Sequence, residues 1–229
     1  MRNLKISRSL LISILVLSLT AAVALASSLN NSSTRSNTTV PNPAFNPTAA
    51  ASGNQKAVFA GGCFWGMEGV FEHLKGVSDV VSGYAGGNAA TATYEQVSSG
   101  DTDHAESVEV TYDPSKISYG ELLKIYFFVA HDPTQLNRQG PDFGKQYRSE
   151  IFFTTDQQKQ VAEAYIQQLN EAKAFAQPIV TQTAPLNQFY AAEAYHQDFI
   201  DRNPLKPYVV IHDLPQIRQL QAEFPDLYE

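Results

Sequence analysis

The sequence predicts an α/β protein, an α+β two-layer sandwich in which helices cover one face of a sheet. Two observations carry this prediction. Segments with the apolar pattern of strands alternate with segments of helical spacing, and the first strand passes into the first helix through a Gly-Gly turn. A length of 229 residues fits one domain or at most two.

The first half of the domain contains five expected elements. Lys56–Gly62 is predicted as a short buried strand that ends in a glycine turn, and the spacing of apolar residues over Phe64–Leu74 predicts a helix. Val77–Gly87 is expected to be a strand that runs into a glycine-rich loop, and Tyr94–Ser98 a short helix or turn. Apolar and polar residues alternate over Ala105–Pro114, which predicts a strand that stops at the proline.

The second half opens with a helix over Tyr119–Ala130, because Ser118-Tyr119-Gly120-Glu121 has the capping-box pattern. His131–Ser149 holds too many turn residues for a regular element, so we expect a long ordered loop, and such loops are usually functional. The remaining expected elements are a strand at Glu150–Phe153, a long helix at Asp156–Ala174, a last strand at Pro178–Gln182 and a helical segment at Asn187–Phe199.

The first 55 residues have the composition of a leader and a linker. Residues 1–26 are predicted as a cleaved signal peptide, with a positive start, the apolar run Leu10–Leu25 and small residues before Ser27. An uncleaved N-terminal anchor is the alternative, although the apolar run is short for a membrane span. Residues 27–55 are rich in Ser, Asn, Thr, Pro and Ala and are expected to be a disordered linker. The folded domain is therefore predicted at 56–229, exported to the periplasm or secreted.

The charge distribution excludes one class of partner. All 23 acidic residues follow position 55, so the domain is acidic. Proteins that bind nucleic acid need a basic face, and we therefore expect no nucleic-acid partner. The sequence also holds a single cysteine, Cys63, which excludes an intramolecular disulfide.

Cys63 stands between the Gly-Gly turn and the predicted helix. The helix dipole and the free N–H groups at that end favour a thiolate, which predicts a lowered thiol pKa. Such a thiolate can attack an acyl carbon, or the sulfur or oxygen of an oxidised substrate. The alternative is that a lone cysteine is a small buried apolar residue.

The histidines do not decide between these chemistries. Acyl transfer needs a histidine near the cysteine, and none of the five histidines has a diagnostic context. His104-Ala105-Glu106 matches half of a zinc deaminase motif, but the cysteine half of that motif is absent, so no metal is expected.

Six short blocks of the domain stand out, in chain order: Gly62–Gly66 (GCFWG), Gly83–Gly87 (GYAGG), Thr93–Val97 (TYEQV), Ser99–Glu106 (SGDTDHAE), His131–Ser149 (HDPTQLNRQGPDFGKQYRS) and Tyr195–Phe199 (YHQDF). Together they resemble the motifs of the A-type peptide methionine sulfoxide reductases. The resemblance covers nearly all of the chain from Lys56 to about Val210. It implies an α/β sandwich with a ferredoxin-like core, and reduction of methionine-S-sulfoxide, free or in proteins, as in the repair of oxidised proteins.

The resemblance also implies roles for individual residues. Cys63 would attack the sulfoxide sulfur, and Glu106 would be the acid that protonates the sulfoxide oxygen. Glu106 would be buried with a raised pKa, whereas Glu109 would lie on the opposite, solvated face of the same strand. The hydroxyls of Tyr94 and Tyr147 would donate hydrogen bonds to the oxygen without a change of charge.

Three further residues are placed at the substrate pocket by the resemblance. Asp142 would orient groups or a water there. Phe64 and Trp65 would form an apolar wall for the S-methyl group of the substrate, and ordinary core packing is the alternative for both.

No metal or bound organic cofactor is implied, and the product on Cys63 would be a sulfenic acid. Many relatives have resolving cysteines near the C-terminus, but Gln216–Glu229 has none, and Ser98 stands where some relatives have a cysteine. We therefore expect an external thiol reductant, such as thioredoxin, glutaredoxin with glutathione or another thiol. The other expected partners are oxidised proteins or free methionine sulfoxide, and the protein is expected to be a monomer.

Two other functions are kept as alternatives. A cysteine-dependent acyl hydrolase or thiol peroxidase would act on an ester or a peroxide rather than on an S-sulfoxide. A non-catalytic module that binds methionine or its sulfoxide would need neither Cys63 nor Glu106, so the presence of both favours an enzyme.

Overall fold

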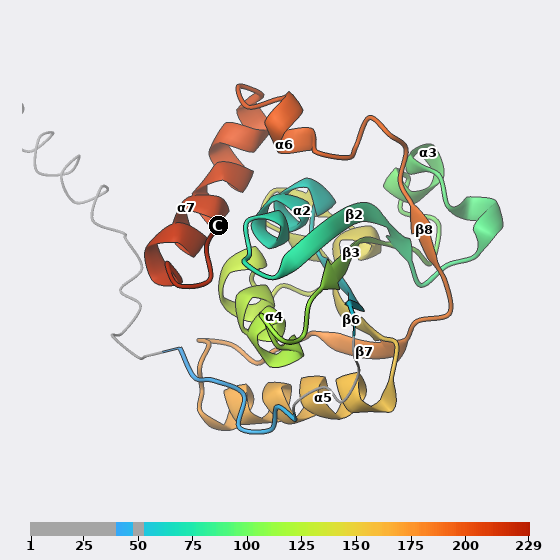
Figure 1. Cartoon of the computed structure of the whole chain (residues 1–229). Helices are drawn as coiled ribbons and strands as arrows, with labels where there is room; N and C mark the ends of the chain where they lie inside the picture. The colour runs from blue at the N-terminus through green and yellow to red at the C-terminus, as the bar shows by residue number, and fades with distance from the viewer. Residues whose placement is uncertain (1–39, 48–52) are drawn as a thin grey trace, which may run out of the picture. The chain divides into compact units, whose positions relative to one another are not determined.

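The computed structural model describes residues 40–47 and 53–229 (Figure 1). The predicted signal peptide and most of the predicted linker lie outside the described residues. None of the helices in the described ranges combines the length and the apolar character that a membrane span requires.

One sheet of six strands organises the domain. Its order is β7-β6-β1-β3-β2-β8, and every neighbouring pair is antiparallel except the parallel pair of β6 and β7. The strands are β1 (Gln55–Gly61), β2 (Val77–Ala85), β3 (Ala105–Tyr112), β6 (Ser149–Phe153), β7 (Gln182–Pro185) and β8 (Phe189–Ala191). A separate two-stranded ribbon joins β4 (Arg138–Gln139) to β5 (Asp142–Phe143).

The four central strands and two helices form the ferredoxin-like core that the resemblance implies. Helix α2 (Phe64–Glu72) connects β1 to β2, and helix α4 (Tyr119–Ile125) lies between β3 and β6 in the chain. With the strand order β6-β1-β3-β2, this is the β-α-β-β-α-β arrangement. Ser118 and Glu121 form the predicted capping box at the start of α4.

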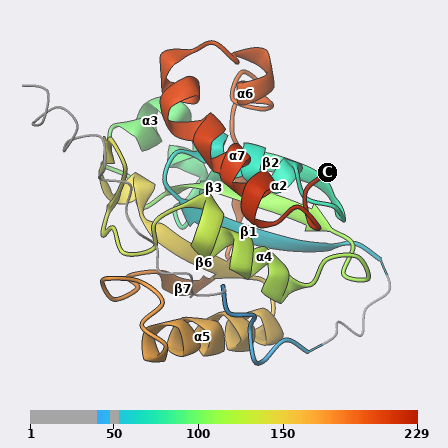
Figure 2. The same ribbon diagram turned by 90° about the vertical axis from the view of Figure 1, so that its left-hand side faces the viewer.

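The helices cover one face of the sheet (Figures 1 and 2). Buried apolar side chains of β1 and β3 pack there against α2, α4 and α5 (Asp156–Glu171). The turn η4 (Val209–Asp213) and helix α7 (Leu214–Glu223) pack against α2 and against the turn η2 (Tyr126–Ala130) that continues α4. The C-terminal helix thereby lies against the helix that begins after Cys63.

The sheet is strongly curled, and its edge strands approach one another. A flat sheet would separate β7 from β8 by five strand spacings, roughly 24 Å. Three residues, 186–188, join these two strands, and four residue steps reach at most about 14 Å. The face away from the helices carries a small cluster in which alanines leave room for this curl; its members are Val58, Ala60, Ala85, Ala105 and Phe152.

Two of the elements predicted from the sequence are wrong. Pro178–Gln182 was expected to be a strand, but β7 begins only at Gln182, because backbone N–H groups of the segment donate to Asn170 Oδ1 and to the carbonyl of Pro133 instead. Asn187–Phe199 was expected to be helical, but it contains β8, which pairs with the edge of β2. Helix α7 was not predicted.

Residues 40–47, which fall within the predicted disordered linker, lie against the domain. The backbone N–H of Ala44 donates to Gln168 Oε1 at 2.8 Å, and Asn46 Nδ2 donates to Ser118 Oγ at 3.0 Å. Tyr165 and Gln168 of α5 donate in turn to backbone carbonyls of this segment. Its low apolar content therefore does not prevent docking, because hydrogen bonds to α4 and α5 hold it.

Candidate active site

A glycine turn places Cys63 at the point where β1 ends and α2 begins. Gly62 has φ +102°, and a Cβ built there would lie 2.5 Å from Gln139 Cγ, so only glycine fits the turn without strain. Cys63 caps α2 and is half-buried. The strand and the helix thus fix the thiol at one end of the sheet.

The expectation of a lowered thiol pKa is wrong. Burial raises the pKa of Cys63, and the negative charges of Glu106, Asp213 and Asp142 add to the rise. A hydrogen bond from the backbone N–H of Trp65 acts in the opposite direction but is outweighed. The helix N-terminus therefore contributes as expected, and burial among carboxyl groups reverses the net effect.

Glu106 on β3 lies next to the start of α2. Its Oε2 accepts a hydrogen bond of 3.1 Å from the backbone N–H of Phe64, and the side chain is 2% exposed. Burial raises the pKa of Glu106 to about 8, with a smaller contribution from the charge of Asp142. Glu109 lies on the opposite strand face, where it forms an ion pair with Lys56. Near neutral pH, Glu106 is accordingly a neutral acid, and it bonds to Phe64, which directly follows Cys63.

Two tyrosine hydroxyls are available near this acid. Tyr94 begins α3 (Tyr94–Ser98), and Tyr147 ends the short turn η3 (Lys145–Tyr147). Burial raises the pKa of both tyrosines, and the charge of Glu106 is the second cause in each case. Within residues 40–47 and 53–229, neither hydroxyl has a hydrogen-bond partner, so both can donate to a ligand.

Asp142 lies on β5, in the long loop. The hydroxyl of Tyr208 donates a short hydrogen bond to its Oδ2. The charge of Asp142 also contributes to the raised pKa values of Cys63, Glu106 and Tyr147. The structure therefore brings Asp142 into the same electrostatic environment as the other predicted residues.

Phe64 and Trp65 occupy different environments. Phe64 is 1% exposed and packs against Tyr84, with ring centroids 5.9 Å apart, so core packing accounts for most of its surface. Trp65 is half-buried, and its ring stacks on Phe199 at a centroid distance of 3.6 Å. Its Nε1–H donates to His196 Nδ1 at 3.1 Å, which fixes the indole in place.

The sequence analysis did not single out the groups that support this arrangement. His196 packs against Tyr94 as well as Trp65, and Glu193 accepts from the backbone N–H of Tyr94 and from the Tyr84 hydroxyl. The block Tyr195–Phe199 was the available signal for His196. No motif pointed to Tyr208, because η4 and α7 were not predicted.

A cavity of about 90 Å³ opens beside Cys63. It lies between the turn after β1, the loop that carries β4 and β5, and the C-terminal helix. Glu106, Tyr94 and Tyr147 are not part of its wall. The lining residues are Gly61, Cys63, Ala130, Gln139, Gly140, Pro141, Tyr208, His212, Asp213 and Gln216.

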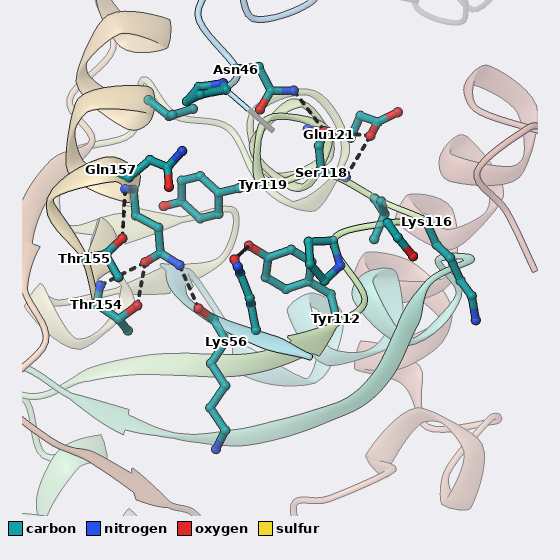
Figure 3. Close-up of a pocket in the computed structure, with 17 residues that line it drawn as sticks. Asn46, Lys56, Tyr112, Lys116, Ser118, Tyr119, Glu121, Thr154, Thr155 and Gln157 are labelled. Atoms are coloured by element: carbon teal, nitrogen blue, oxygen red, sulfur yellow. Dashed lines mark hydrogen bonds between the residues drawn. The ribbon is translucent and has the colours of Figure 1, made fainter. Parts of the chain in front are cut away.

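A larger cavity, of about 630 Å³, lies at the other end of β1 (Figure 3). Its polar groups bond mostly to one another: Gln158 donates to the carbonyl of Lys56, and the Tyr112 hydroxyl donates to Gln55. It contains neither a cysteine nor a histidine. Cys63 and the other residues of the predicted site lie away from this cavity.

The described residues include no cluster of three or more His, Cys, Asp and Glu side chains that could hold a metal ion. His104 is buried, and its Nε2 lies 2.9 Å from the carbonyl oxygen of Asn88. The histidine of the zinc deaminase half-motif therefore takes part in a hydrogen bond with the backbone.

A ferredoxin-like core that carries a thiol, a neutral carboxyl and two phenol donors at one end of its sheet is suited to a thiol-dependent enzyme. Comparison with known proteins gives the family. The model of the peptide methionine sulfoxide reductase family matches residues 55–227, and the chain belongs to that family.

The similarity to known enzymes extends over most of the chain. The chain is 58% identical over 190 residues to peptide methionine sulfoxide reductase MsrA 2 of Synechocystis sp., and the match covers 82% of this chain and 89% of that protein. The chain is 59% identical over 179 residues to MsrA 2 of Mesorhizobium japonicum, and that match covers 78% of this chain and 92% of the relative.

Solved structures agree with the fold. The reduced form of Mxr1 from Saccharomyces cerevisiae is 34% identical and superposes with a TM-score of 0.62, covering 71% of this chain and 92% of that one. Methionine sulfoxide reductase A of Corynebacterium diphtheriae is 36% identical, with a TM-score of 0.59 and coverage of 69% and 78%.

Proposed function

We propose that this enzyme reduces methionine-S-sulfoxide, free or in proteins, through thiolate attack by Cys63 with Glu106 as the acid. The observation that carries the proposal is the hydrogen bond between Glu106 and the backbone N–H of Phe64. It holds a buried carboxyl, neutral near pH 7, next to the only thiol of the sequence.

The chemistry needs both groups. A sulfoxide sulfur becomes electrophilic when its oxygen is hydrogen-bonded and protonated. Tyr94 and Tyr147 donate to that oxygen, and Glu106 supplies the proton. The sulfur of Cys63 then bonds to the substrate sulfur, the hydroxyl passes to Cys63, and methionine leaves. The thiol proton restores Glu106, so Cys63 ends as a sulfenic acid and the step is balanced.

An external thiol completes the cycle, because the sequence has no second cysteine to act as a resolving thiol. Thioredoxin, glutaredoxin with glutathione, and small thiols are the candidate reductants. Residues 1–26 favour export, so we place the reaction outside the cytosol; N-terminal sequencing of the protein from fractionated cells tests this.

Reaction without a reductant tests the mechanism. The enzyme is mixed with an excess of each epimer of a methionine sulfoxide peptide. We expect one equivalent of methionine per enzyme from the S epimer, with a sulfenic acid on Cys63 detected by chemical trapping and mass spectrometry. The R epimer should release none, and neither should Cys63→Ser. Equal reaction of both epimers, or release of methionine by the serine variant, contradicts the proposal.

A further inference from the structure

One buried carboxyl near Cys63 has no part in the mechanism so far. Asp213 lies at the end of η4, where a π-helical turn meets α7, and it is 3% exposed. Among the ion pairs of the described residues none includes Asp213, and its Oδ2 has no hydrogen-bond partner. A carboxylate without a cation or a donor is costly to bury, so the environment favours the protonated form.

The packing against α2 supports a proton on Asp213. Gly66, in the first turn of α2, has no Cβ; an added Cβ would lie 2.9 Å from Asp213 Oδ1 and 2.7 Å from Gln216 Oε1. Gln216 Nε2 donates to the carbonyl of Ala130, and Gln216 Oε1 also has no partner among the described residues. Two acceptor oxygens therefore face the space beside one glycine with no donor among the described residues, which favours a proton on Asp213.

Asp213 also shares a wall with the thiol. Both side chains line the cavity of about 90 Å³, whereas Glu106 does not. Since water occupies about 30 Å³ in the liquid, this volume admits a few waters but not a peptide. The cavity is thus suited to hold a leaving hydroxyl beside Cys63.

We propose that Asp213 is the proton donor of the second half-reaction, in which an external thiol reduces the Cys63 sulfenic acid. This inference rests on the proposed function. The thiolate sulfur bonds to Cys63 Sγ and the Sγ–O bond breaks. The oxygen takes the proton of Asp213 and leaves as water. The incoming sulfur is oxidised, Cys63 is reduced to a mixed disulfide, and the proton released by the incoming thiol restores Asp213.

The separation of the two acids follows from the geometry of displacement. A thiolate attacks a sulfur in line with the bond that breaks. A reductant that enters where methionine has left, beside Glu106 and the tyrosines, pushes the hydroxyl away from them, and none of these groups is in the wall of the cavity that Cys63 shares with Asp213. Rotation about the Cβ–Sγ bond brings the oxygen into the cavity, where the donor is Asp213.

The test measures the two half-reactions separately in the full chain. Methionine release without a reductant reports the first. Formation of the mixed disulfide with 2-mercaptoethanol, followed by rapid quenching and mass spectrometry, reports the second. For Asp213→Asn we expect the first rate to be kept or to rise, because removal of this negative charge lowers the pKa of the Cys63 thiol. The second should fall ~10²-fold or more, the range of a positioned general acid.

The pH profile separates a proton donor from a packing residue. Burial, followed by the charge of Asp142, raises the pKa of Asp213 to about 7. The rate of mixed disulfide formation is divided by the concentration of the 2-mercaptoethanol thiolate, which itself varies with pH. This corrected rate should fall as the pH rises through about 7, and Asp213→Asn should not show the decline. Cys63, Tyr208 and His212 line the same cavity, and Asp142 lies behind it, bonded to the Tyr208 hydroxyl. His212→Gln is therefore measured as well and must keep the decline.

Asp226→Asn is the matched control, since it removes an exposed carboxyl from the same C-terminal segment. It should change neither rate. An unchanged second rate in Asp213→Asn, an equal loss in both half-reactions, or loss of the pH decline in His212→Gln would overturn the inference. Failure of the unchanged protein to release methionine would instead overturn the proposed function.

Discussion

Glu106 illustrates how an unfavourable burial creates a reactive group. Its carboxyl is removed from water, and the single N–H of Phe64 compensates only part of the cost. The result is a carboxyl that keeps its proton near neutral pH. An exposed glutamate on the surface would be ionised there.

Replacing this acid with an isosteric amide should slow the first half-reaction. For Glu106→Gln we expect single-turnover methionine release to fall ~10²–10⁴-fold, because the amide cannot deliver a proton. The unchanged protein should also lose rate as the pH rises through about 8, where Glu106 ionises, and the variant should not show that break. Rapid-quench kinetics measure both, and Glu109→Gln is the surface control. A near-normal rate in Glu106→Gln would place the acid elsewhere.

The same carboxyl should make stability depend on pH. Its folded-state pKa is raised from 4.5 to about 8, so the folded state binds more protons than the unfolded state between these values. Stability is therefore lost as the pH rises from about 4.5 to 8. Compared with Glu106→Gln, the unchanged protein should lose on the order of a few kcal/mol more between pH 5 and pH 9 in urea unfolding. A constant difference between the two proteins contradicts this.

Tyr94 and Tyr147 are assigned to one substrate oxygen, so each can partly replace the other. We expect Tyr94→Phe and Tyr147→Phe to cost less than about tenfold each in single-turnover rate, and the double variant to cost more than the product of the two. Strict additivity in the double-mutant cycle would show that the hydroxyls act at different places.

At the scale of elements, the turn between β1 and α2 determines where the thiol lies. Gly62→Ala would force a side chain into a left-handed conformation and against Gln139. We expect a loss of about 1–3 kcal/mol in the free energy of unfolding and a displaced Cys63 with a lower single-turnover rate. Gly53→Ala is the control, since its φ of +101° is similar but nothing lies within 4 Å. Equal effects of the two variants would show that the contact with Gln139 is unimportant.

The elements also show what could be predicted from sequence. The strands around Lys56–Gly62 and Ala105–Pro114, and the cap at Ser118, follow from local patterns, and the structure confirms them. Asn187–Phe199 has a local helical pattern, but Gly83 leaves β2 open to the close approach of Phe189 and Tyr190, and strand pairing prevails. Such pairing depends on residues far away in the sequence.

The site shows the same limit. Motif resemblance named Cys63, Glu106 and both tyrosines, and the structure places them around one end of the sheet. The direction of the Cys63 pKa shift could not be predicted, because its largest cause is the burial of the thiol, and the nearby charges of Glu106 and Asp213 are brought together only by folding. Local patterns therefore identify reactive groups but not their electrostatic neighbours.

At the scale of the whole molecule, the single cysteine of the sequence limits how the proposed catalytic cycle can close. In a protein with a resolving cysteine, a second thiol of the same chain acts at a high effective concentration. Here the reductant must approach Cys63 from solution, past the half-buried Trp65 and the C-terminal helix. Reduction of the Cys63 sulfenic acid by the external thiol is therefore expected to be slower than reduction of the sulfoxide.

The choice of reductant should reflect this approach. Without reductant, the first equivalent of methionine should appear rapidly; steady-state turnover should then rise with the concentration of a small thiol and remain slow with thioredoxin alone. The physical reason is access, because a small thiol such as glutathione reaches a half-buried sulfur more readily than a bulky thioredoxin does, and glutaredoxin can then act on the glutathione adduct formed on Cys63. If the protein is exported, the cytosolic glutathione pool is not available to it.

The measurement compares burst and steady-state rates with three reductants: dithiothreitol, glutathione with glutaredoxin, and thioredoxin with its reductase. Turnover with thioredoxin alone as fast as the burst would show that recycling does not limit the enzyme, even if the roles of Cys63 and Glu106 hold.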